Sequence, residues 1–216
     1  MIIKKFKKRL LTSIALFITI FLILHYNFLL LFALIIFGVL SILEFFNIIK
    51  KITKNNFIKL TQNLMFVLYV FIFCLLFFVF SEIIQLKIIL FIILFGCIAS
   101  DIGGFIVGKT LKGPKLTRIS PNKTISGSLG SIVFTIVVMN LLFLFFLNMS
   151  SLSLIAISLF TSIGCQVGDL FFSYLKRKAK IKDTGNLLPG HGGILDRLDG
   201  IFLGIPVGFL SLNLFY

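Results

Sequence analysis

Charge is scarce in this sequence, and acidic charge is scarcest of all. Only 13% of the 216 residues are Asp, Glu, Lys or Arg, whereas about a quarter of a soluble domain is charged. Hydrophobic residues make up 59% of the chain, and several apolar runs reach the roughly 20 residues that cross a bilayer. This composition excludes a soluble enzyme with a separate water-exposed domain. We therefore expect an all-α, polytopic integral membrane protein.

Tryptophan is absent, and cysteine and histidine are nearly so. Without Trp, the aromatic belts at the membrane interfaces must use Tyr and Phe. Cys74, Cys97 and Cys165 lie within apolar runs and lack the spacing of metal ligands. We expect no disulfide from these three residues, and no zinc site, because His and Cys are nowhere spaced to form one.

Apolar runs predict about seven membrane-spanning helices. Their approximate bounds are 10–24, 28–49, 64–80, 86–107, 125–147, 152–175 and 198–215. The first run is short, which leaves open a re-entrant hairpin formed by the first two. The basic start of the chain resembles a signal peptide, but no small-residue cleavage site follows it, so we expect an uncleaved first span.

Basic residues alternate between the predicted loops. Of the 21 Lys and Arg residues, all except Lys87 lie before residue 10 or in the segments 50–63, 108–124 and 176–197. Seven spans put these four segments on one side of the membrane, and the positive-inside rule makes that side cytoplasmic. Membrane orientation and attraction to anionic lipids therefore explain the net charge of +14. We expect membrane lipids, and no nucleic acid, as partners.

Five of the seven acidic residues lie at this same side: Asp101, Asp169, Asp183, Asp196 and Asp199. An ionised residue within a span faces the protein interior or a wet cavity by default. For Asp101 and Asp169, snorkelling to the interface is the alternative. Asp196 and Asp199, one helical turn apart, repel each other unless a cation lies between them. Mg²⁺ suits a few carboxylates with substrate phosphates, and Arg197 is the alternative partner.

A polar helix face leads from Asp169 into the longest basic loop. Ser173 and Lys176 follow Asp169 at spacings of four and three residues, which puts all three on one face. Gln166 extends this face by one turn in the other direction. The loop that follows is rich in candidate phosphate ligands, for which positive-inside charge is the alternative explanation: Lys176, Arg177, Lys178, Lys180 and Lys182.

Two glycine-rich loops complete the candidate site. In the segment Pro189–Gly193, glycines allow the backbone to approach a ligand closely and to present amides to an anion. In the other loop, Ser120 and Pro121 predict the start of a helix, whose N-terminus would bind an anion beside Lys123 and Thr124. The P-loop pattern is absent. Together these loops suit a nucleoside triphosphate with a metal ion and an anionic lipid.

One long pattern resembles the signature of the phosphatidate cytidylyltransferase (CDP-diacylglycerol synthase) family. It reads Ser173-x-x-Lys176-Arg177-x4-Lys182-Asp183-x-Gly185-x-x-Leu188-Pro189-Gly190-His191-Gly192-Gly193-x-x-Asp196-Arg197-x-Asp199. The upstream segments Gln166-x-Gly168-Asp169, Asp101-x-x-Gly104-Phe105-x-x-Gly108 and Ser120-Pro121-x-Lys123-Thr124-x-x-Gly127 also resemble this family. The family usually has a basic residue where Asn122 stands and an acidic one where Ser126 stands.

The resemblance implies a nucleotidyltransferase of the bacterial inner membrane. It would transfer CMP from CTP to phosphatidate, giving CDP-diacylglycerol and pyrophosphate, the first committed step of bacterial-type phospholipid synthesis. Residues 1–99 are then N-terminal membrane helices, and residues 100–216 carry the catalytic signature within one integrated membrane domain. Members are typically longer, with more N-terminal spans. The resemblance also implies a homodimer, an N-terminus and active-site loops in the cytoplasm, and Mg²⁺, with a second cation left open.

The resemblance assigns roles residue by residue. The expected metal ligands are Asp169, Asp196 and Asp199. The expected catalytic residues are Asp169, Ser173, Lys176, Arg177, Lys182, Asp183, His191 and Arg197, with Ser173 orienting groups and not attacking, because no adjacent base activates it. The expected substrate-binding residues are Asp101, Ser120, Lys123, Thr124, Gly190, Gly192 and Gly193.

Two other classes of function stay open at this point. One is a related CTP-dependent membrane transferase acting on an isoprenoid lipid, or a kinase that transfers the γ-phosphoryl group. The other is a small ion-coupled transporter, although transporters place their charges near the bilayer centre and here the acids lie at the ends of the predicted spans.

Overall fold

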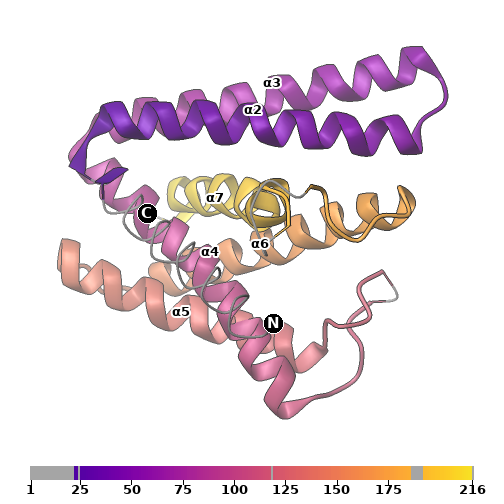
Figure 1. The fold of residues 1–216 in the computed structure, drawn as a ribbon. Coiled ribbons are helices and arrows are strands. Elements are labelled where there is room, and N and C mark those ends of the chain that lie inside the picture. Colours follow the sequence, from indigo (N-terminus) through magenta and orange to yellow (C-terminus); the bar gives the residue numbers. More distant parts are fainter. Residues whose placement is uncertain (1–21, 24, 118, 186–191, 216) are drawn as a thin grey trace, which may run out of the picture. The chain divides into compact units, whose positions relative to one another are not determined.

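The computed structural model describes residues 22–23, 25–117, 119–185 and 192–215. Across these ranges the long elements are all helices, and an isolated β-bridge joins Lys115 and Thr124. The helices are labelled in Figure 1, and their bounds are α2 (Asn27–Ile52), α3 (Asn56–Ser81), α4 (Ile84–Leu111), α5 (Ile125–Leu147), α6 (Leu152–Lys178) and α7 (Leu195–Phe215). The predicted all-α class is confirmed.

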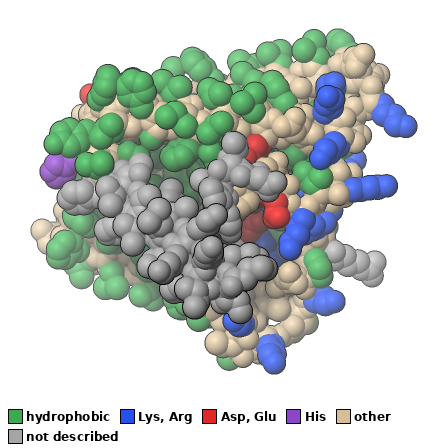
Figure 2. Space-filling view, viewed as in Figure 1, with side chains coloured by type: hydrophobic (Ala, Val, Ile, Leu, Met, Phe, Trp, Pro, Cys, Tyr) green, Lys and Arg blue, Asp and Glu red, His purple; other side chains and the backbone are tan. Residues whose placement is uncertain are grey.

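All six helices are long and apolar enough to cross a membrane. The expectation of a helical membrane protein is therefore confirmed. The first predicted span, 10–24, falls almost entirely outside the described residues, so the count of seven stays a prediction. Figure 2 shows hydrophobic side chains covering the face of the α2–α3 pair, with Lys and Arg side chains at the end where α2 passes into α3.

The described chain divides into two compact units, and the division falls inside α6 and inside α7. The first unit contains α2, α3, the last residues of α6, the following loop and the start of α7. Within it, α2 and α3 pack along each other, and the rings of Phe45 and Phe66 stack with centroids 3.9 Å apart. This packing holds the middle of α2 in place.

The second unit contains α4, α5, most of α6 and most of α7. Helices α4 and α5 approach backbone to backbone: a Cβ added at Gly103 would lie 2.7 Å from the carbonyl oxygen of Gly130. Helices α6 and α7 do the same, because a Cβ at Gly168 would lie 2.5 Å from the carbonyl oxygen of Asp199. Small residues at such crossings are how helices pack tightly in a membrane.

Two predicted boundaries are wrong. Hydropathy predicts a loop over 50–63, but α3 begins at Asn56, because the Asn55 side chain caps it and accepts from the backbone N–H of Phe57 at 2.9 Å. The predicted helix start at Ser120 and Pro121 is a turn instead. Helix α5 begins at Ile125, after Thr124 supplies its N-cap.

Candidate active site

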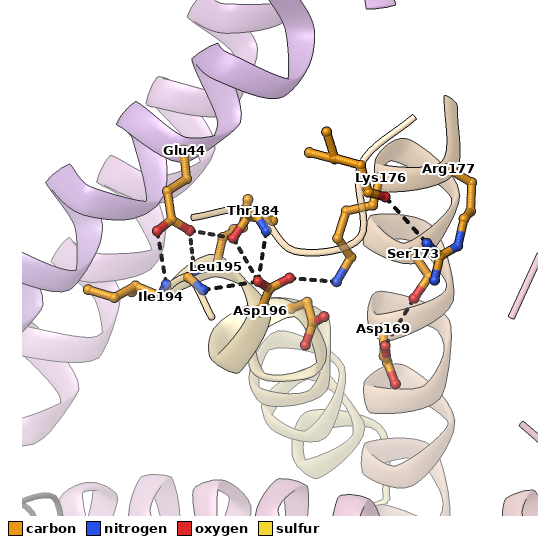
Figure 3. A network of polar contacts seen from close by, with 12 residues as sticks. Glu44, Asp169, Ser173, Lys176, Arg177, Thr184, Ile194, Leu195 and Asp196 are labelled. Carbon is orange, nitrogen blue, oxygen red and sulfur yellow. Dashed lines mark hydrogen bonds and ion pairs between the residues drawn. The ribbon is translucent and has the colours of Figure 1, made fainter. Parts of the chain in front are cut away.

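Asp196, in the first turn of α7, is the centre of a polar network in the first unit (Figure 3). Its Oδ1 accepts a hydrogen bond from Lys176 Nζ at 2.7 Å. Its Oδ2 accepts from the backbone N–H of Thr184 at 2.8 Å and from that of Gly193 at 3.1 Å. One carboxylate oxygen therefore organises the loop, and the other faces a cation.

The chain places these groups by simple helix chemistry. Asp196 reaches back to the backbone N–H of Gly193, three residues earlier, as the acidic residue of a capping box does. Lys176 lies in the last turn of α6, where a cation complements the helix dipole. Both side chains are nearly buried, with 11% of Lys176 and 10% of Asp196 exposed. The cation that pairs with Asp196 in this unit is thus Lys176, where the sequence suggested a metal ion or Arg197.

Sequence reasoning missed Glu44, a carboxylate of α2 that is 3% exposed. Its Oε1 accepts from the backbone N–H of Ile194 at 3.0 Å, and its Oε2 accepts from the backbone N–H of Leu195 at 2.9 Å. The hydroxyl of Thr184 donates to Oε2 at 2.6 Å. Figure 3 shows this carboxylate pointing from α2 toward the first turn of α7. The signal was present, since an acid inside an apolar run is costly and functional by default.

Two signature glycines lie directly against Glu44. A Cβ at Gly185 would lie 2.6 Å from Glu44 Oε1, and one at Gly193 would overlap both Glu44 and the Thr184 hydroxyl. Gly192 has a φ of +85°, a conformation that favours glycine, and a Cβ there would lie 3.1 Å from Asp196 Oδ2. The predicted substrate-binding role of Gly192 and Gly193 stays a prediction. At both positions, however, a side chain would crowd neighbouring residues of the protein itself.

A second polar cluster, in the second unit, is centred on Asp169 of α6. Its Oδ2 pairs with Lys123 Nζ, and its Oδ1 accepts from the Ser173 hydroxyl at 3.4 Å. Lys123 lies in the turn before α5, so this loop contacts α6 through Asp169. This pair is more exposed to solvent than the Lys176–Asp196 pair, with 27% of the Lys123 side chain and 28% of the Asp169 side chain exposed.

Polar contacts continue from Asp169 along α6. Gln166 donates to the backbone carbonyl of Ser128 at 3.3 Å and to the Ser162 hydroxyl at 3.2 Å. It also accepts from the Ser128 hydroxyl. The predicted polar stripe is therefore real, and it joins α6 to α5. The Thr124 hydroxyl, predicted to bind nucleotide, accepts from the backbone N–H of Gly127 and caps α5.

The other predicted residues differ in their surroundings. Asp199 is 7% exposed, and its Oδ1 accepts from the backbone N–H of Gly200 at 3.0 Å. Arg177 is exposed and donates to the carbonyl of Ile181 at 3.3 Å, beyond the end of α6. Asp101 is exposed within α4, and Ser120 lies beside the turn before α5. Lys182 and Asp183 are exposed in the loop after α6, and Arg197 is exposed in the first turn of α7. Gly190 and His191 lie outside the described residues.

Aspartate oxygens are hard ligands of the kind that Mg²⁺ takes. Asp196 and Asp169 each direct one oxygen at a lysine ammonium, so each presents an oxygen to a positive charge. Among the residues described, no three His, Cys, Asp or Glu side chains form a metal site by themselves. A divalent ion fits this donor set where substrate phosphates complete its coordination. That Asp169, Asp196 and Asp199 share one ion stays a prediction.

Comparison with known proteins shows which family the sequence matches. The model of the cytidylyltransferase family matches residues 2–215. The chain is 43% identical to a phosphatidate cytidylyltransferase of Bacillus subtilis over 128 residues, which cover 57% of this chain and 48% of the relative. It is 42% identical to one of Helicobacter pylori over 107 residues, covering 50% and 40% of the two chains.

A third relative, a phosphatidate cytidylyltransferase of Rickettsia bellii, is 42% identical over 136 residues, which cover 57% of this chain and 58% of the relative. The chain thus spans about half the length of the curated relatives it matches.

Proposed function

Because the chain belongs to the cytidylyltransferase family, we propose that it transfers CMP from CTP to phosphatidate. The products are CDP-diacylglycerol and pyrophosphate. The names of its relatives support this substrate pair. The observation that carries the proposal is the Asp196–Lys176 pair, which joins the two ends of the family signature at the borders of two membrane helices. A nearly buried ion pair between a carboxylate and an ammonium group suits phosphate chemistry at the membrane surface.

The reaction is an in-line displacement. A phosphate oxygen of phosphatidate forms a new bond to the α-phosphorus of CTP, and the bond from that phosphorus to the bridging oxygen breaks. The electron pair leaves with pyrophosphate. No protein nucleophile is needed, since the phosphate monoester is already anionic at neutral pH. Catalysis then consists of positioning the two substrates and stabilising charge.

The chain's own residues supply that positioning. Lys176 and Lys123, each beside an aspartate, hold phosphate groups. Arg177 and Arg197 have the planar fork for bidentate phosphate contacts. Ser173 orients Asp169 through its hydroxyl. Thr124, Ser120, Asp101, Asp183, Lys182 and the glycine-rich segment with Gly190, His191, Gly192 and Gly193 form the rest of the proposed substrate site.

The family generally uses a divalent cation. We propose Mg²⁺ held by Asp169, Asp196 and Asp199. At Asp196 the ion would take the place of the Lys176 ammonium at Oδ1, because Oδ2 accepts from two backbone amides. When bound, the ion would neutralise phosphate charge. Bacterial relatives and the apolar helices favour the bacterial inner membrane, and the basic loops favour a cytoplasmic site. A homodimer is part of the same proposal.

A lipid-product assay tests this function. The purified full chain receives labelled CTP, Mg²⁺ and phosphatidate, and CDP-diacylglycerol is the expected product. Asp196→Asn removes the charge at the centre of the network and should lower the rate at least about 10-fold. The matched control is Glu82→Gln, at an exposed acid that accepts from Asn27 at 3.2 Å, and it should keep the full rate.

Two results would contradict the proposal. One is the absence of CDP-lipid with wild-type protein, and the other is full activity of Asp196→Asn. An isoprenoid phosphate offered in place of phosphatidate separates the two transferase classes: a product formed only from the isoprenoid would replace phosphatidate as the acceptor.

A further inference from the structure

Glu44 has none of the features of a residue that meets substrate. Within the described chain it accepts hydrogen bonds from the backbone amides of Ile194 and Leu195 and from the Thr184 hydroxyl. These three donors occupy most of the roughly four lone-pair positions of a carboxylate. The side chain is 3% exposed. Its role must therefore be exerted through the residues that it holds.

What Glu44 holds is the first turn of α7. The first backbone N–H groups of a helix have no partner within the helix. At the start of α7 the amides of Ile194 and Leu195 are satisfied by Glu44, and that of Gly193, just before the helix, is satisfied by Asp196. A negative charge at this end also complements the helix dipole. Glu44 thus caps α7 from a distant part of the chain.

Thr184 links Glu44 to Asp196. Its hydroxyl lies 2.6 Å from Glu44 Oε2 and 3.1 Å from Asp196 Oδ2, and its backbone N–H donates to the same Asp196 oxygen at 2.8 Å. The two carboxylates therefore contact the same two segments, residue 184 and residues 193–195. A displacement of Glu44 would release a hydroxyl and two amides that define where Asp196 points.

We propose that Glu44 is a positioning residue that fixes the first turn of α7 and thereby orients the Asp196 carboxylate for cytidylyl transfer. The inference rests on the proposed function. The same contacts exclude another use of this helix end: the amides of Ile194 and Leu195 are not open to a substrate phosphate, because Glu44 already accepts from them.

The test compares Glu44→Gln with Glu82→Gln in the purified full chain. A glutamine can keep at most one oxygen and turns an NH₂ group toward a backbone N–H or the Thr184 hydroxyl. We expect a 10- to 100-fold fall in kcat, the range typical when a partner of a ligating carboxylate is lost. KM for CTP should stay near the wild-type value, so that kcat and kcat/KM fall together. Glu82→Gln should change neither constant.

Hydrogen exchange supplies a measurement that does not depend on activity. Peptides covering residues 192–199 should exchange faster in Glu44→Gln than in Glu82→Gln, because at least one of the two amides held by Glu44 loses its acceptor. Full kcat in Glu44→Gln would overturn the inference. So would a loss of activity that matches the unfolded fraction, which indicates a purely structural role. Wild-type protein that forms no CDP-lipid would instead overturn the proposed function, and the exchange data would still test the cap.

Gly185 offers a second test in case Glu44→Gln does not fold. The three atoms nearest to a Cβ at Gly185 all belong to Glu44, the closest being Oε1 at 2.6 Å. Gly185→Ala should therefore displace the carboxylate and lower kcat about 10-fold. In a Glu44→Asp background the shorter side chain leaves room, and the added loss should be smaller. Strictly additive losses would show that the glycine acts independently of Glu44, and would overturn the inference.

Discussion

The Thr184 hydroxyl is the smallest group whose removal tests the polar network. It is buried, with 8% of the residue exposed, and it lies between the Glu44 and Asp196 carboxylates. Its single proton can serve one carboxylate at a time, and the 2.6 Å contact identifies Glu44 as the main acceptor. Thr184→Val replaces the hydroxyl with a methyl group of similar size. The substitution therefore removes a hydrogen bond without opening a cavity.

The expected cost follows from the charge of the acceptor. A hydrogen bond to a charged group contributes about 1.5–3 kcal/mol net. Without the Thr184 hydroxyl, Glu44 Oε2 keeps the Leu195 amide as a donor and loses this bond. Taking about 2.5 kcal/mol, and about 2–4 °C per kcal/mol for a chain of this size, the melting temperature should fall by about 5–10 °C. Thr184→Ser keeps the hydroxyl and loses one methyl group, so it should cost only about 1 kcal/mol.

Cys97 and Cys165 provide the assay. Both thiols are free and buried, each with 2% of the residue exposed. A thiol-reactive fluorophore added to detergent-purified protein during heating therefore reports unfolding. A melting temperature of Thr184→Val within about 1 °C of wild type would refute the reasoning. If Thr184→Ser lowered the melting temperature as much as Thr184→Val, the reasoning would also be refuted, because the methyl group and not the hydroxyl would then determine the stability.

Two further predictions concern the ion pair and the glycine crossing. Lys176→Met should destabilise the protein by about 3–5 kcal/mol, because it leaves Asp196 buried without its cation; adding Asp196→Asn should recover part of this loss in the same thiol assay. Gly130→Ala should cost about 1–3 kcal/mol, since its Cβ would lie 2.9 Å from the Gly103 carbonyl oxygen. Gly38→Ala, with its nearest neighbour at 3.3 Å, is the matched control and should cost less than half as much.

The helices were predictable because hydropathy depends on local sequence. The predicted span 125–147 coincides with α5, and four of the other five described helices begin and end within a few residues of their predictions. The exception is the start of α3, eight residues before the predicted 64. Hydropathy detects the part of a helix that lies in lipid, whereas the cap at Asn55 starts α3 among polar residues such as Lys59 and Gln62.

Within the site, contacts set by helix spacing were predictable and contacts between distant segments were only partly so. Asp169 and Ser173 share a helix face as their spacing requires, and they form a hydrogen bond. The sequence placed Lys123 and Asp169 in one candidate site, but spacing did not predict their pairing, which joins residues 46 positions apart. For Asp196 the sequence indicated the need for a cation, but spacing alone could not identify Lys176 from the preceding helix.

Glu44 shows most directly why spacing could not predict the whole site. Its partner Thr184 is 140 residues away, and Leu195 is 151 residues away. The N-terminal spans resemble the family only as apolar helices, so no motif draws attention to this acid. Yet Gly185 and Gly193, two glycines of the signature, lie where a Cβ would strike the Glu44 carboxylate. Two glycines of the signature are therefore explained by Glu44, a residue outside it. This acid, buried in α2, leaves no room for a side chain at either glycine.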